Sequence, residues 1–125
     1  MILEEIEFEL SKTIGKSIKE IDILWDGDGM EVFSMEFKDG SDLDIKNSKR
    51  KTGDDFRIHS DSDLENFKNA EILSFELIEN YEFGNEVIDS LVFSTNKGKI
   101  NLYFENEGRD DSGWGLAAML IFMNL

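Results

Sequence analysis

The stretch VIDSLVFSTNKGKINLYFE, residues 87–105, decides the fold class of this chain. Apolar and polar residues alternate on both sides of a turn at residues 96–98, and a period of two places every second side chain on one face of a strand. The glycine in the turn tolerates the backbone conformations that tight hairpins need. The stretch therefore predicts an antiparallel hairpin whose alternating apolar residues are Leu91, Phe93, Ile100, Leu102 and Phe104.

The same period continues outside this hairpin. Alternating segments bounded by Asp, Gly and Ser predict a three-stranded meander between residues 18 and 45, and a single helical turn is expected within 60–67. The last stretch is apolar on both faces, as a central strand covered twice would be. The expected strands are 18–25, 33–37, 43–45, 56–59, 70–81, 87–95, 99–105 and 116–122.

Residues 2–13 allow two interpretations. Leu3, Ile6 and Leu10 recur at helical spacing, whereas Ile6, Phe8 and Leu10 alternate as in a strand. Glutamates near the start favour the helix, because carboxylates there meet the positive end of the helix dipole. We therefore expect one domain, residues 1–125, of class α+β and mostly β: an antiparallel sheet or open barrel of about eight strands with an N-terminal helix packed against it.

Acidic charge dominates the composition. The chain has 28 Asp and Glu residues against 13 Lys and Arg, a formal net charge of −15. Such a surface repels nucleic acid and anionic membranes, so neither is an expected ligand, and a basic protein is the expected partner. The competing interpretation is that the charge serves solubility. We expect a monomer rather than an oligomer.

The chain lacks the residues on which several site classes depend. It has no Cys, which excludes disulfides, thiolate zinc sites and cysteine nucleophiles. Glutamates fill the N-terminus where a secretory signal needs a basic and an apolar region, and the longest apolar run, 116–123, is too short to span a bilayer. We expect a cytoplasmic protein.

No motif for catalysis or metal binding is complete. His59 is the only histidine and has no nucleophile with which to form a triad, so a surface position at the end of a strand is expected. The acidic turns at 26–29 and 61–63 resemble fragments of calcium loops but do not complete a ligand set. We therefore expect no enzyme activity, no cofactor and no metal.

Two loops have an unusual composition. Residues 46–51 concentrate four basic residues, which either relieve self-repulsion or orient a partner with mixed charge. Residues 106–115, NEGRDDSGWG, join the last two expected strands with three glycines, several acids and Trp114. Loops of this length are often functional. Trp114 is either a lid over the core or an exposed aromatic anchor among acids, as at interface hot spots.

The segment LVFSTNKGKINLYFENEGRDDSGWG, from Leu91 onward, resembles the immunity proteins of contact-dependent growth inhibition and related polymorphic toxin systems. The shared features are a hairpin of the form T-x-x-G-x-hydrophobic, an Asn- and Gly-rich loop with an aromatic residue, and a last apolar strand, together covering residues 91–122. The resemblance implies a cytosolic bacterial antidote that binds one toxin domain and blocks its active site. Many such toxins are nucleases, whose clefts are positive because they hold phosphates.

Charge and resemblance together predict an acidic immunity protein, an antitoxin that blocks the active site of a basic nuclease toxin, with an RNase as the favoured target. The alternatives are a phage-encoded inhibitor that mimics nucleic acid against a host nuclease, and a small-molecule binder or enzyme with a carboxylate site in a barrel mouth. The expected contact centres on the loop 105–115, because a glycine-flanked Trp in an acidic loop combines apolar area with charge. The candidate partner-binding residues are Glu105, Glu107, Asp110, Asp111 and Trp114, with Asp54, Asp55, Asp61 and Asp63 as second choice.

Overall fold

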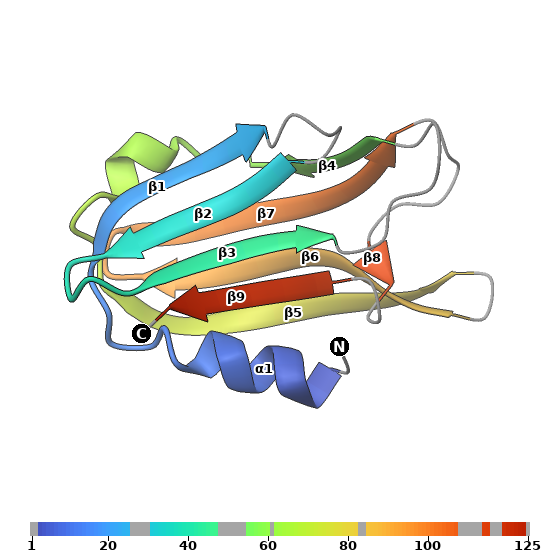
Figure 1. Cartoon of the computed structure of the whole chain (residues 1–125), viewed down its shortest axis with the longest axis horizontal. Coiled ribbons are helices and arrows are strands. Elements are labelled where there is room, and N and C mark those ends of the chain that lie inside the picture. The colour runs from blue at the N-terminus through green and yellow to red at the C-terminus, as the bar shows by residue number, and fades with distance from the viewer. Residues whose placement is uncertain are drawn as a thin grey trace.

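Two antiparallel sheets, stacked one behind the other, form the body of the protein (Figure 1). This computed structural model describes residues 3–25, 31–47, 55–60, 62–82, 85–107, 114–115 and 119–124. The first sheet has the order β1-β2-β3-β9, with β1 at Ile18–Trp25, β2 at Glu31–Phe37, β3 at Asp42–Asn47 and β9 at Met119–Asn124. The second has the order β4-β7-β6-β5, with β4 at Asp55–His59, β5 at Ile72–Glu82, β6 at Asn85–Thr95 and β7 at Gly98–Glu107, while the short β8 (Trp114–Gly115) also pairs with β6.

The strand pattern of the sequence is largely confirmed, but the number of sheets is not. Each sheet is built around a three-stranded antiparallel unit: the expected meander β1-β2-β3, and β5-β6-β7, which contains the expected hairpin. The mostly β class with one N-terminal helix is therefore correct. The expectation of one sheet or an open barrel is wrong for the described strands, which divide between two sheets. Alternation shows which face of a strand is apolar, but not which strands share a sheet.

The two sheets bury their apolar faces against each other. Phe33 on β2 and Phe93 on β6 are fully buried, and their rings stack with centroids 6.2 Å apart. Both belong to a single apolar cluster drawn from the two sheets and the helix. Face-to-face packing of this kind leaves the opposite face of each sheet to carry the polar side chains. The surface pattern is thus a consequence of the core.

The N-terminal segment is a helix, α1 (Leu3–Ser11), as expected. Ile6 and Leu10 are fully buried while Phe8 is 63% exposed, a separation that the strand interpretation does not allow. The helix contacts β5 and β9 along one side of the sandwich (Figure 1). None of the helices in the described ranges is long and apolar enough to cross a membrane.

The last strand differs from the expectation. It was expected at 116–122 in a central position, whereas β9 spans Met119–Asn124 and pairs, among the described residues, with β3 alone at the end of the first sheet. This edge strand also contacts α1, so its apolar residues have a helix as well as a strand next to them. A doubly apolar pattern therefore does not by itself indicate a central strand.

A short ladder joins the two sheets at one corner. The segment 15–18 runs antiparallel to 69–72, with Ile18 N–H donating to the Ala70 carbonyl at 2.8 Å and Asn69 N–H donating to the Ile18 carbonyl at 2.7 Å. Asn69 has a φ of 69°, a left-handed conformation that Asn tolerates better than most residues. The start of β1 is thereby fixed to the start of β5.

A polar network locks the same end of the first sheet. Lys16 pairs with Asp39 in the turn between β2 and β3, and its Nζ also donates to Ser41 Oγ at 2.9 Å. The Lys16 ammonium lies 5.7 Å from the centroid of the Phe37 ring. Hydrogen bonds from Lys16 first, and then from Ser41, hold the pKa of the Asp39 carboxyl well below its usual range.

Asp39→Asn tests this network through the pH dependence of stability. A lowered pKa means that the contact stabilises the fold above the ordinary carboxyl pKa of 3.8, and that this stabilisation is lost as pH falls toward the lowered value. We expect the variant to be less stable than the wild type at neutral pH, and the difference to shrink at about pH 3 in urea denaturation. The control is Asp63→Asn, since Asp63 makes no side-chain capping hydrogen bond. A difference that is equal at both pH values would contradict the assignment.

Candidate functional site

Five carboxylates lie in two rows on the outer face of β1, β2 and β3. Their neighbours along each strand point into the core, so the period of two turns these side chains outward. Strand register sets Glu20 opposite Glu36 and Glu36 opposite Asp42 in the first row. The second row runs from Asp22 through Ser34 to Asp44. We call Glu20, Asp22, Glu36, Asp42 and Asp44 the acidic sheet face.

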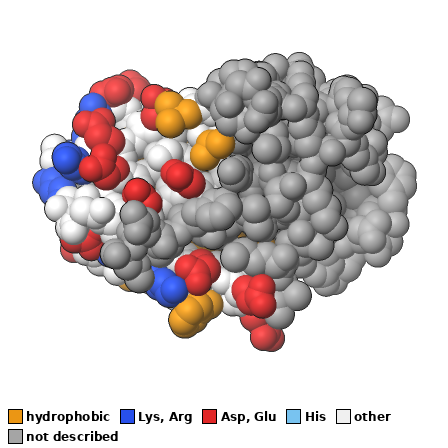
Figure 2. All heavy atoms as spheres, in the orientation of Figure 1, with side chains coloured by type: hydrophobic (Ala, Val, Ile, Leu, Met, Phe, Trp, Pro, Cys, Tyr) orange, Lys and Arg blue, Asp and Glu red, His pale blue; other side chains and the backbone are white. Residues whose placement is uncertain are grey.

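Figure 2 shows acidic side chains gathered over this sheet, in the part of the surface that is described. Glu20 and Glu36 are directly opposite each other on neighbouring strands, with side chains 58% and 47% exposed. Like charges in that arrangement destabilise a sheet. Repulsion between these carboxylates therefore opposes folding.

Two lysines offset part of this charge. Lys68 Nζ lies 3.1 Å from a Glu20 oxygen and 3.2 Å from a Glu65 oxygen, and both hydrogen bonds, Glu20 first, raise the pKa of Lys68. Lys19 Nζ lies 3.4 Å from Glu36. These pairs are exposed and contribute little stability. They leave the face with more acids than cations.

Asp22 stands apart from these pairs. Its Oδ1 accepts a hydrogen bond from the Ile23 N–H at 2.8 Å. Within the described part of the chain, no lysine or arginine forms an ion pair with it. Asp22 is thus an exposed carboxylate without an ion pair among the described residues.

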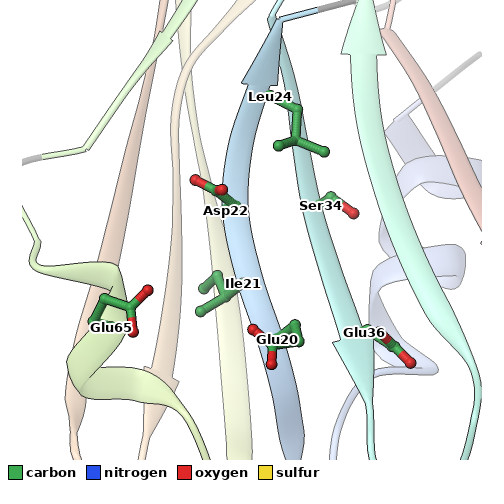
Figure 3. Close-up of a pocket in the computed structure, with 7 residues that line it drawn as sticks. All are labelled: Glu20, Ile21, Asp22, Leu24, Ser34, Glu36 and Glu65. Carbon is green, nitrogen blue, oxygen red and sulfur yellow. The ribbon is translucent and has the colours of Figure 1, made fainter.

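A shallow hollow of about 230 Å³ crosses β1 beside these residues. Figure 3 shows Glu20, Asp22 and Leu24 on β1, with Glu36 of β2 on one side and Glu65 of the 3-10 helix η1 (Leu64–Phe67) on the other. Leu24 is 50% exposed and supplies an apolar contact next to the acids. The described residues include no group of three or more His, Cys, Asp or Glu placed to hold a metal ion.

The outer face of the second sheet has a different character. By register and burial, its described outward side chains include one acid, Glu76, and one base, Lys99. The others are neutral, and we call the set the neutral sheet face: Ser74, Glu76, Ile78, Val92, Ser94, Lys99, Asn101 and Tyr103. Among the side chains that the structure describes, acids are therefore more numerous on the outer face of the first sheet than on that of the second.

The structure brings together some of the residues expected at the site. Asp55 on β4 pairs with Glu107 on β7, and Glu105 lies two residues away on the same strand. Trp114 pairs through its backbone with Ile88, in β8. Asp63 instead precedes η1, beyond the other end of β4, and is exposed. Asp54, Asp61, Asp110 and Asp111 lie outside the described residues.

Sequence reasoning missed the acidic sheet face. Its signal was present in the meander, where the polar positions between buried residues are almost all acidic, as in the DLDIK of β3. Alternation identifies the buried positions of each strand, but the outward acids form two rows only through the register of β1, β2 and β3.

Comparisons with protein-family models, with curated proteins and with solved structures found no match for this chain.

Asp42→Asn tests whether the acidic sheet face carries electrostatic strain. Removing one carboxylate opposite Glu36 should stabilise the fold by about 0.2–1 kcal/mol at low ionic strength, and by less in high salt. The measurement is urea denaturation at two salt concentrations. Glu76→Gln, on the neutral sheet face, is the control and should change stability little. If Asp42→Asn destabilises the protein at low salt, the acids do not repel as described.

Proposed function

We propose that this chain is an acidic inhibitor of the immunity-protein kind, which binds a basic nuclease toxin domain and blocks its active site. The observation that supports this most directly is the acidic sheet face, on the opposite side of the sandwich from a face whose described side chains are nearly neutral. A net charge of −15 spread evenly would suit solubility alone. The gathering of five carboxylates on the outer face of one sheet favours recognition of a cationic surface.

The scaffold suits the task physically. The five carboxylates project from paired strands, so the backbone that carries them is already ordered before binding. Preordered charges lose less entropy on association than charges on a mobile loop. A nuclease cleft built to hold phosphates offers the complementary positive surface.

The identification of a toxin domain as the partner depends on the resemblance of residues 91–122. The argument from charge is independent of that resemblance. A phage-encoded inhibitor of a host nuclease uses the same electrostatics and differs only in the partner. No observation favours the enzyme alternative. The loop 105–115, with Trp114 as anchor, remains a second candidate for the contact.

The test first asks whether a gene next to the one for this chain encodes a nuclease domain, and then uses that domain; the lack of such a gene would count against the proposal. We expect the chain to inhibit that domain and to associate with it more slowly as salt rises, because screening acts beyond about 8 Å at physiological ionic strength. Absence of inhibition, or association rates that do not depend on salt in stopped-flow measurements, would contradict the proposal.

Paired charge reversals locate the contact in the same assay. Asp22→Lys, on the acidic sheet face, should slow association several-fold. Glu76→Lys changes the net charge by the same amount on the neutral sheet face and should have a much smaller effect. Trp114→Ala weakens binding by about 2 kcal/mol or more if the loop 105–115 is the anchor. A large effect of Trp114→Ala without one of Asp22→Lys would move the contact to that loop.

A further inference from the structure

Within the described residues, one side of β1 pairs with no other strand over most of its length. The opposite side pairs with β2 from Ile18 to Trp25. The first side bonds to the segment 69–71 through Ser17 and Ile18 and has η1 next to it, but no described strand pairs with it beyond Ile18. An unpaired strand edge presents backbone donors and acceptors to any segment that can lie alongside it.

The direction of the edge groups follows from one hydrogen bond. Ile23 N–H donates to the Asp22 carboxylate, so it points away from β2. Backbone groups alternate in direction along a strand, so Ile21 points its N–H and C=O to the same free side. The side chains of Ile21 and Ile23 lie on the inner face, while Asp22 between them lies on the outer face.

Asp22 disfavours the pairing of another strand with this edge. Its carboxylate occupies the Ile23 donor that an added strand would need. Glu20 and Glu65 lie on the two sides of the same hollow, and because the single cation of Lys68 pairs with both, a net negative charge remains there (Figure 3). An acidic strand, including β1 of a second copy, meets like charge here, which is how natural edges avoid self-association.

We propose that the edge of β1 that faces away from β2 accepts one extended segment of the basic partner as an added strand. Lysine or arginine side chains on that segment make the edge available by pairing with Asp22. A cation placed opposite Asp22 pairs with the carboxylate and releases the Ile23 N–H for a backbone hydrogen bond. Exposed Leu24 contacts an apolar residue of the same segment. The inference rests on the proposed function, since it assigns a binding mode to the same basic partner.

Register determines which residues of the added strand place a cation next to Asp22 and which donate backbone hydrogen bonds to β1. The added strand runs antiparallel to β1, so a residue opposite Asp22 has its side chain on the outer face and its own N–H pointing away from β1. Its neighbours, opposite Ile21 and Ile23, point their N–H groups at β1. Lysines and apolar residues must therefore alternate, and only the apolar residues supply the backbone donors.

Three synthetic peptides test this division. The probe is the acetylated, amidated heptapeptide Val-Lys-Val-Lys-Val-Lys-Val; one derivative carries N-methyl groups on its valines and the other on its lysines. All three have the same charge. We expect the unmodified and lysine-methylated peptides to bind alike, and the valine-methylated peptide to bind at least about tenfold more weakly, because it lacks the donors that face β1. Affinity is measured by titration calorimetry, and NMR follows the amide signals of Ile21 and Ile23.

The outcomes separate this mode from the proposed function. Equal affinity for all three peptides, or amide shifts that spare Ile21 and Ile23, overturns strand addition and leaves the electrostatic contact standing. Failure of every peptide to bind also overturns it, while inhibition of the nuclease domain reports on the proposed function independently. Loss of affinity on valine methylation alone, with shifts at Ile21 and Ile23, supports it.

Discussion

The packing of the two inner sheet faces is the constraint on which the rest of the structure depends. Phe33 and Phe93 meet across the sandwich, and buried residues of both sheets and of α1 surround them. Once these side chains point inward, the period of two requires the residues between them to point outward. The rows Glu20-Glu36-Asp42 and Asp22-Ser34-Asp44 follow from the same register that closes the core. A shift by one residue would bury the acids and expose the apolar set, so core and acidic sheet face are fixed together.

The two outer faces then differ in a way that packing does not require. Acids anywhere on the surface would serve solubility, yet the outward side chains described on the second sheet include only Glu76 and Lys99 as charged residues. Repulsion between neighbouring acids on the first sheet costs stability. In the function that we propose, this local negative field speeds the capture of a cationic partner and makes it more selective. In the binding mode that we propose, Asp22 adds selectivity at the backbone, because its bond to the Ile23 N–H disfavours a second copy of the chain and yields to a cation.

Much of the fold was readable from the sequence, because strands with one buried face leave a clear alternation. The alternating residues around Phe93 predicted the hairpin that contains it. The helical spacing of Ile6 and Leu10 predicted α1, in which both are buried and Phe8 is exposed. The division into two sheets was not readable, since pairing between strands distant in sequence leaves no local pattern. The edge position of β9 was missed because an apolar strand beside a helix resembles a central one. The candidate site was predictable only in its charge: Asp22 and Asp44 become neighbours of Ser34 only through register.

Amide hydrogen exchange of the chain, free and bound to the basic nuclease domain, tests the central claim most directly. If the acidic sheet face is the binding surface, binding slows exchange in peptides from β1, β2 and β3 and leaves those from β5 and the first half of β7 unchanged. Protection of β1 on its free edge, at Ile21 and Ile23, is the expected maximum. Protection confined to the second sheet or to the loop 105–115, with β1–β3 unchanged, would contradict the account.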